Sequence, residues 1–388
     1  MSQQVRQPVR QFAPARVRRL ILWLSVSLLT ACSSTADKPK PPELPVLSAA
    51  SASSPLTRVW SNRVGAIDTP LSLWAKDSQV AVASSDGLLA LIDATSGRDI
   101  WRLALNTPVQ AGVGGDGSRF AVVTQSNEVI AVQAGQVIWR YRLSASTYTA
   151  PLVAGGRVFV LTADRMVIAL DGGTGQRLWS QQRTGDPLVL KQAGLLMAVG
   201  DTLVAGMSGR LVGLNPNNGS TRWESVVGAS RGTNEVERLV DIVAGVSRQG
   251  GLVCARSFQT AVSCVDAVKG VTLWTRPSIG HQGLDGNEAQ VIGTESDSKM
   301  VAWSLANGQP AWTSDALRFR GLTAPLVWGN SFVVGDEAGL LHRLSILDGQ
   351  TLSRSNTDGS AIAARPVAAA GLLVVATRSG GLYGYRLD

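Results

Sequence analysis

Short apolar segments separated by polar turns fill the chain from residue 56 to its end. One unit reads as an opening segment at residues 149–153 and a β-rich run at 156–161. Other copies show a polar turn at 85–87 and a second apolar run at 88–93. No amphipathic helical period of any length interrupts this order. The pattern therefore predicts units of four short antiparallel strands.

A turn motif marks the end of each unit. In its first full copy Asp93 caps the turn, Gly97 follows four residues later, and Trp101 follows four residues after that. An Asp or Asn side chain caps such a turn, and glycine tolerates a positive φ there. The tryptophan-equivalent positions are 60, 101, 139, 179, 223, 274, 312 and 353, the last of which is Ser353. Their spacing of 38 to 51 residues indicates an array of supersecondary units.

The two ends of the array complete each other. The last unit, at residues 378–388, stops after its third strand, while residues 56–60 supply a lone tryptophan-bearing strand at the start. An N-terminal strand that completes the C-terminal unit would close a ring. We therefore predict an all-β fold, an eight-bladed β-propeller of four-stranded antiparallel blades spanning residues 56–388.

The first 55 residues have a different composition. Residues 1–31 carry five arginines and no acid, with an apolar run at 20–29 that suits a signal peptide and is too short to span a membrane. Residues 29–32 resemble a bacterial lipobox, which implies cleavage before Cys32 and its lipidation; an uncleaved anchor is the alternative. Ser33 after the cysteine points to an outer-membrane lipoprotein on the periplasmic face. Residues 32–55 are rich in Ser, Ala and Pro and are predicted to be a flexible tether.

Charge and composition exclude several classes. The formal charge of the 388-residue chain is +8, but it falls to about +3 once residues 1–31 are removed, and no basic run remains that would bind nucleic acid. Two histidines and three cysteines offer little for a metal site, so no metal or cofactor is predicted.

The turn motif resembles that of propellers of the pyrroloquinoline-quinone type. There, a tryptophan stacks on the turn of the next blade, which implies a structural docking role for Trp60, Trp101, Trp139, Trp179, Trp223, Trp274 and Trp312. Quinoprotein dehydrogenases share this repeat, but they are longer and usually carry an adjacent Cys-Cys pair that is absent here. We therefore predict a protein that is not an enzyme; a quinoprotein-like enzyme or sensor is the alternative.

Lipobox, tether and eight repeats together resemble the BamB family, lipoprotein subunits of the outer-membrane β-barrel assembly machinery. The resemblance implies a scaffold that binds the POTRA domains of a BamA-like barrel-inserting subunit. The family's binding segments match Leu188, Leu190 and Lys191, and then Arg238 and Asp241. Lys191 replaces a common arginine, and Val243 replaces an acidic residue. A lipoprotein binding module with another partner is a third possibility.

Simpler interpretations of these segments stay open. Leu188 and Leu190 would lie on one face of a strand, with Val189 opposite, and could be strand core. Arg238 and Asp241 could form an ion pair within their loop. Unfolded outer membrane proteins are a possible further partner, added at the exposed edges of the blades.

Two cysteines are placed symmetrically about Gln259. In a hairpin Cys254 and Cys264 would face each other across two strands, where they form either a disulfide or a pair of packed thiols.

Overall fold

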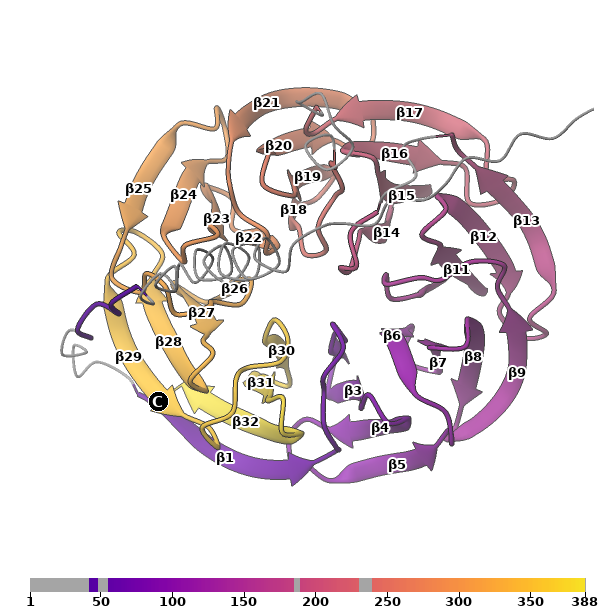
Figure 1. The fold of residues 1–388 in the computed structure, drawn as a ribbon, viewed down its shortest axis with the longest axis horizontal. Helices are drawn as coiled ribbons and strands as arrows, with labels where there is room; N and C mark the ends of the chain where they lie inside the picture. Colours follow the sequence, from indigo (N-terminus) through magenta and orange to yellow (C-terminus); the bar gives the residue numbers. More distant parts are fainter. Residues whose placement is uncertain (1–41, 48–54, 185–188, 230–238, 388) are drawn as a thin grey trace, which may run out of the picture. The chain divides into compact units, whose positions relative to one another are not determined.

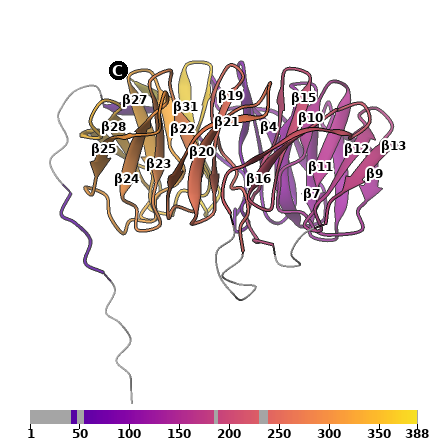
Figure 2. The ribbon, with the colours of Figure 1, turned by 90° about the horizontal axis from the view of Figure 1, so that it is seen from above.

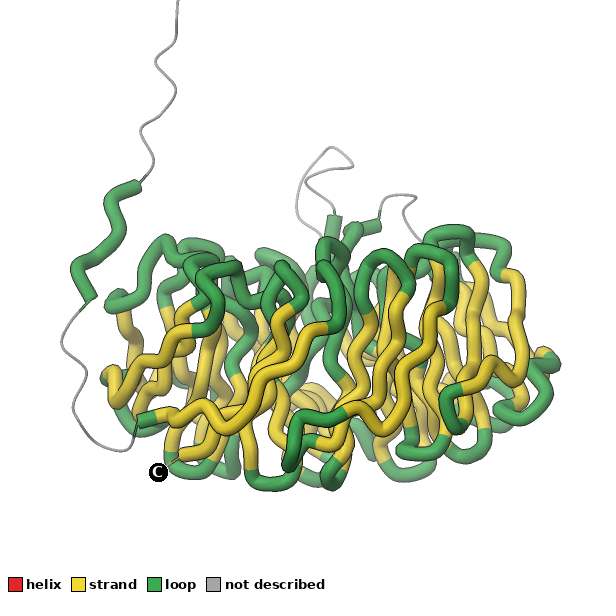
Figure 3. The backbone as a smooth tube through the Cα atoms, turned by 90° about the horizontal axis from the view of Figure 1, so that it is seen from below, coloured by secondary structure: helices red, strands yellow, loops and turns green. Residues whose placement is uncertain are grey.

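Eight four-stranded antiparallel sheets surround a central axis in the computed structural model of the chain (Figure 1). The structure describes residues 42–47, 55–184, 189–229 and 239–387. Residues 44–388 form one compact unit, and residues 1–43 form another, of which only 42 and 43 are described. Over the described ranges the chain has strands and loops and no helix, as Figure 3 shows. The same ranges contain no helix that could cross a membrane.

Each blade runs from a short inner strand to an outer one. Blades 1 to 4 consist of β2 (Trp74–Lys76), β3 (Gln79–Ala83), β4 (Leu88–Asp93), β5 (Asp99–Ala104); β6 (Val109–Gly115), β7 (Arg119–Thr124), β8 (Glu128–Gln133), β9 (Gln136–Arg142); β10 (Leu152–Ala154), β11 (Arg157–Leu161), β12 (Met166–Asp171), β13 (Arg177–Gln182); β14 (Leu196–Val199), β15 (Thr202–Met207), β16 (Arg210–Leu214), β17 (Thr221–Val226). Blades 5 to 8 consist of β18 (Ser247–Gln249), β19 (Leu252–Ser257), β20 (Ala261–Asp266), β21 (Val271–Pro277); β22 (Leu284–Gly286), β23 (Gln290–Thr294), β24 (Met300–Ser304), β25 (Pro310–Ser314); β26 (Leu326–Trp328), β27 (Ser331–Gly335), β28 (Leu340–Ser345), β29 (Thr351–Asn356); β30 (Val367–Ala369), β31 (Leu372–Ala376), β32 (Gly381–Leu387), β1 (Leu56–Arg63).

The position of a strand within its blade decides its hydrophobic pattern. The two middle strands are buried on both faces by neighbouring blades, so β3 and β4 are continuous apolar runs. The outer strand β5 has one face on its neighbour and one in solvent, and its burial alternates. Side chains packed between adjacent blades thus form the core of the ring.

The ring closes between the two ends of the chain. Strand β1 pairs antiparallel with β32, in a register that runs from Leu56 opposite Leu387 to Arg63 opposite Gly381. The prediction of eight blades, with an N-terminal strand completing the last one, is confirmed.

Seven tryptophans join one blade to the turn of the next. Trp60 Nε1 donates to Ala94 O at 2.7 Å, and its ring lies against Gly97, whose φ is +72°. A Cβ atom at Gly97 would come within 2.5 Å of that ring, so only glycine fits there. The other six lie in the same way against the turn glycines 135, 175, 219, 270, 308 and 349.

The two cysteines of blade 5 lie next to one of these tryptophans, Trp274, in the same sheet. Cys254 and Cys264 are register partners on β19 and β20, and their sulfur atoms are joined as a disulfide. Cys264 is in turn paired with Trp274 on β21. The bridge therefore lies inside the packed junction between blades 5 and 6, where both residues are fully buried.

Candidate partner-binding site

Every connection from one blade to the next begins and ends on the same face of the ring. In a four-stranded antiparallel blade, the connection from the outer strand to the next inner strand lies on the same side as the turn between the two middle strands. We call this side the connection face. Figure 2 shows the ring edge-on, with its two rims of loops. Every residue predicted to bind a partner belongs to the connections from blade 3 to blade 4 and from blade 4 to blade 5.

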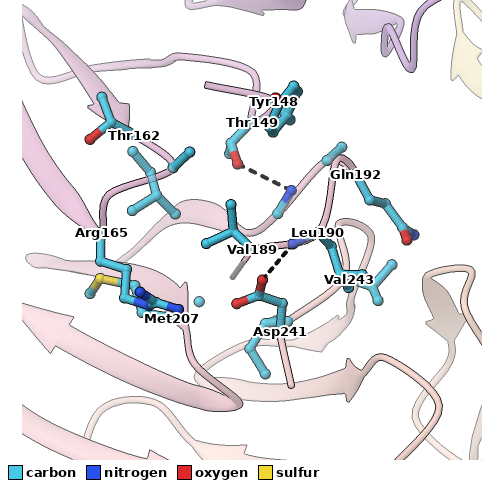
Figure 4. Close-up of a pocket in the computed structure, with 16 residues that line it drawn as sticks. Tyr148, Thr149, Thr162, Arg165, Val189, Leu190, Gln192, Met207, Asp241 and Val243 are labelled. Carbon is cyan, nitrogen blue, oxygen red and sulfur yellow. Dashed lines mark hydrogen bonds between the residues drawn. The ribbon is translucent and has the colours of Figure 1, made fainter. Parts of the chain in front are cut away.

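These two connections are hydrogen-bonded to each other. The amide of Leu190 donates to Asp241 Oδ2 at 3.0 Å (Figure 4), and the amide of Ala244 donates to Ala193 O at 2.9 Å. The amide of Gly194 donates to Thr149 Oγ1 at 3.1 Å, so the preceding connection also supports the site. These contacts between loops hold residues 189–195 in a defined conformation.

A small pocket of about 50 Å³ lies between the two connections. Val189, Leu190, Met207 and Val243 provide apolar walls, and Asp241 lies at its edge (Figure 4). Burial raises the pKa of the Asp241 carboxyl above its ordinary value, opposed by the Leu190 amide and by the positive charge of Arg165. A half-buried carboxylate beside apolar side chains can both orient a loop and receive a cation from a partner.

The site includes an arginine in an unusual backbone conformation. Arg165 has a φ of +63° in the turn between β11 and β12, and its Nε donates to Ser208 Oγ at 2.6 Å. The same turn has Gly87 in blade 1 and Asn127 in blade 2, both also at positive φ. An arginine where neighbouring repeats have glycine or asparagine is unfavourable for the backbone. Sequence reasoning missed Arg165, although comparing this turn position between repeats would have revealed it.

The structure places some of the predicted binding residues together. Leu190 and Asp241 line the same pocket, whereas Lys191 is exposed and lines a central cavity of about 500 Å³. Leu188 and Arg238 lie outside the described residues, and so does any ion pair between Arg238 and Asp241. Val243 is buried in the pocket wall.

One expectation about this segment is wrong. No strand runs through residues 189–195, because β14 begins only at Leu196. Val189 and Leu190 therefore do not point to opposite faces of a sheet; both line the pocket. The physical reason is that the Leu190 amide bonds to a carboxylate of the neighbouring connection and has no strand partner.

The central cavity opens among the connections and is lined by small residues and several cationic ones. Lys191, Arg365 and Arg378 line it together with Asp68 and His281. Burial and the positive charge of Arg256 lower the pKa of His281, which favours the neutral form of its ring. Among the described residues, no three His, Cys, Asp or Glu side chains form a group that could hold a metal ion.

Comparisons with known proteins point to one family. A family model described as "Outer membrane protein assembly factor BamB" matches residues 85–314. The chain is 35% identical to the outer membrane protein assembly factor BamB of Burkholderia pseudomallei (strain K96243), over 93% of this chain and 96% of that protein.

Solved structures agree with the sequence comparison. The crystal structure of BamB from Moraxella catarrhalis matches with a TM-score of 0.78 and 26% identity, covering 86% of this chain and all of that one. The quinohemoprotein alcohol dehydrogenase from Comamonas testosteroni matches with a TM-score of 0.65 at 14% identity, covering 85% of this chain and 76% of that chain. At that identity the second likeness shows the propeller fold alone.

Proposed function

The chain belongs to the family of BamB outer membrane protein assembly factors, and from this membership we propose that it is a non-enzymatic scaffold of the outer-membrane β-barrel assembly complex. We further propose that it is synthesised with a signal peptide at residues 1–31 and lipidated on Cys32. The lipid would hold it at the periplasmic face of the outer membrane, and residues 32–55 would be its tether. In this role it binds the POTRA domains of the BamA-like barrel-inserting subunit.

The observation that carries this proposal is the joined pair of connections at the pocket. The bond from the Leu190 amide to Asp241 fixes an apolar wall, and exposed Lys191 adds a cation beside it. Apolar anchors within a charged rim are the usual anatomy of a specific protein interface. Leu188 and Arg238 belong to the same connections in sequence and complete the proposed contact set.

The enzyme alternative has less support. Asp93 and Asp171 accept hydrogen bonds from amides of their own turns, so these carboxylates serve the repeat. The two cysteines of the ring are bonded across a hairpin and are not adjacent in sequence. The remaining alternative, a binding module for another partner, is distinguished by the experiment below.

Co-purification from solubilised outer membrane tests the proposal. We expect Leu188→Glu, Lys191→Glu and Asp241→Arg each to lower recovery of the barrel-inserting subunit by about tenfold or more, as loss of a central interface residue does. Because Lys191 is exposed, its charge reversal leaves the fold intact. The matched control is Asp201→Arg, in the turn between β14 and β15 on the opposite rim, where the side chain is 85% exposed.

Two results would contradict the proposal. Normal recovery with all three variants would remove these connections from the interface. Recovery of a different membrane protein by the unmodified chain, lost in the same variants, would favour the binding module with another partner. Thermal unfolding of each variant separates lost binding from lost folding.

A further inference from the structure

Residues 44–47 of the predicted tether lie against the ring in an extended conformation. Their burial alternates: Pro45 and Leu47 are half-buried, while Leu44 and Val46 are 49% and 95% exposed. A period of two is expected when one face of an extended segment lies on a surface. This part of the tether is therefore bound to the ring.

Two contacts hold the segment. Arg320 Nη2 donates to the carbonyl oxygen of Pro45 at 3.4 Å. Leu47 packs against the apolar cluster between blades 6 and 7, whose members include Leu317 and Leu322. One polar contact to the backbone and one apolar side chain together fix both the position and the direction of the segment.

Arg320 is positioned for this contact by buried groups. Its Nη1 lies 3.5 Å from Asp336 Oδ2, and its side chain is only 10% exposed. Asp336 also accepts from His342 Nε2 at 2.9 Å and from the Leu340 amide at 2.8 Å. Burial acts to raise the pKa of Asp336, but these hydrogen bonds outweigh it and hold that pKa below its ordinary value. The guanidinium therefore faces a stable carboxylate and offers Pro45 a preorganised donor.

Arg320 lies on the same side of the ring as the candidate partner site. Arg320 lies in the connection from blade 6 to blade 7, between β25 and β26. That connection emerges on the connection face, as do the two that hold Leu190 and Asp241. The bound tether segment and the candidate partner site thus share one side of the ring.

We propose that residues 44–47 form a strap that fastens the lipid tether to the connection face at the junction of blades 6 and 7. The strap shortens the stretch of chain between Cys32 and its first attachment to the ring from 23 residues (33–55) to 11 (33–43). At ~3.3–3.6 Å per residue, the maximum reach falls from roughly 80 Å to roughly 40 Å. The strap keeps the ring near the membrane with its partner-binding side toward the tether's exit, a consequence that rests on the lipid anchor and partner site proposed above.

Fluorescence anisotropy decay of a dye on residue 46 tests the strap. In the mature chain Val46→Cys offers one reactive thiol, because Cys254 and Cys264 are bonded and Cys32 is either acylated or replaced by serine. We expect the dye to follow the slow tumbling of the ring, and Leu47→Ser or Arg320→Gln to abolish that slow component. Leu44→Ser, at an exposed position of the same segment, is the matched control and should keep it. Arg318→Gln, in the same connection, is a second control that should also keep it.

Two results of the anisotropy measurement would contradict the strap. A fast decay in the otherwise unmodified chain, or an unchanged decay in Leu47→Ser, would overturn the strap. Because Leu47 lies outside the blades, an unchanged melting temperature in Leu47→Ser shows that the ring is intact. The measurement needs neither membrane nor partner, so failure of the proposed partner binding would leave it unaffected.

A second measurement tests the shortened tether. The lipidated chain, bound to phospholipid vesicles containing an acceptor dye, carries a donor at Leu347→Cys, which is 78% exposed. We expect lower energy transfer with Leu47→Ser than with Leu44→Ser, because the released ring moves farther from the bilayer. Equal transfer in the two variants would overturn the shortened reach.

Discussion

Seven junctions between neighbouring blades are built alike, and the eighth is not. At seven, a tryptophan on an outer strand lies against the turn glycine of the next blade. At the junction of blades 7 and 8 the equivalent residue is Ser353. Blade 8 has no such turn, because its third strand β32 and its outer strand β1 come from opposite ends of the chain. The tryptophan is thus present where a turn exists to receive it and absent where the chain ends.

Different residues fill the eighth junction. Arg343 is paired with Ser353 and is buried, whereas Ala131, Ala169 and Gly213 occupy the corresponding positions opposite tryptophans. Polar contacts then bind β29 to blade 8: Ser355 Oγ donates to Leu56 O at 2.8 Å, and Tyr385 Oη donates to Asn356 O at 2.8 Å. The larger Arg343 thus stands opposite the smaller Ser353, and the polar contacts add to an apolar core between the two blades that includes Leu341 and Tyr385.

The largest expected effect comes from removing the closure itself. Deleting residues 55–63 removes β1, the docking of Trp60 and the outer strand of blade 8. Losing the buried tryptophan alone costs about 3–5 kcal/mol, so the free energy of unfolding should fall by at least ~5 kcal/mol. Circular dichroism during thermal and urea unfolding measures this. Deleting residues 42–47 is the control and should lower the ring's stability far less, because it removes only the packing of half-buried Leu47 and the hydrogen bond to Pro45. A similar loss in both deletions would contradict a special role for β1.

Replacing the central residue by alanine, at one tryptophan junction and at the eighth junction, tests whether the two kinds of junction differ in stability. Trp139 is 8% exposed and its Nε1 donates to Gly172 O at 2.8 Å, so Trp139→Ala should cost about 3–5 kcal/mol. Ser353→Ala should change stability by less than about 0.5 kcal/mol, because the buried Ser353 Oγ makes no hydrogen bond to any described residue. Urea unfolding of both variants gives the two values. An equal loss of unfolding free energy in the two variants would mean that the eighth junction depends on Ser353 as much as the other junctions depend on their tryptophans.

The sequence predicts this architecture well because each repeat carries its own markers. Gly97 and Trp101 are repeated at later junctions with the same spacing of four residues, often after an Asp or Asn such as Asp93. Each has a local physical role: an amide acceptor, a positive φ and a ring to stack. The unpaired strand at residues 56–60 predicts the closure. The compensation by Arg343 was not predicted, since it depends on which residue lies opposite position 353 across the sheet, and the repeat spacing carries no such register.

A smaller difference in stability is expected among the seven tryptophan junctions, because not every indole N–H has an acceptor. Trp223 Nε1 is buried but finds no acceptor among the described residues, unlike Trp139 Nε1. Replacing Trp139 by phenylalanine leaves Gly172 O without its donor and should cost about 1 kcal/mol more than Trp223→Phe. Urea unfolding of the two variants measures the difference. Equal losses would show that stacking on the glycine, and not the indole hydrogen bond, determines docking at both junctions.

The candidate site is less predictable than the ring, because loops between blades contact one another and obey no repeat. Leu190 and Asp241 are 51 residues apart, and only the fold shows that the amide of one meets the carboxylate of the other. The family resemblance pointed to Leu190 and Asp241. The expected alternation along a strand placed Val189 on the face opposite Leu190, whereas both residues line the pocket. Arg165 could have been noticed in the sequence, because blades 1 and 2 have glycine and asparagine at the same turn position.

The smallest expected effect is the acid dependence of the docking turns, which the eighth junction lacks. The carboxylate of Asp171 accepts from the Thr174 and Gly173 amides, and these hydrogen bonds lower its pKa below 3.8. A depressed native pKa contributes stability above the unfolded value, and that stability is lost as pH falls through the native pKa. Asp171→Asn should therefore lower the melting temperature slightly at pH 7 and reduce its fall below about pH 4. Asn215 occupies the same turn position in blade 4 and accepts from the Asn217 amide at 2.9 Å, so Asn215→Asp should do the reverse. Melting temperatures measured between pH 3 and pH 7 compare the two variants with the unmodified chain. The same pH dependence in all three would show that the charge of the capping residue does not contribute to the stability of the docking turns.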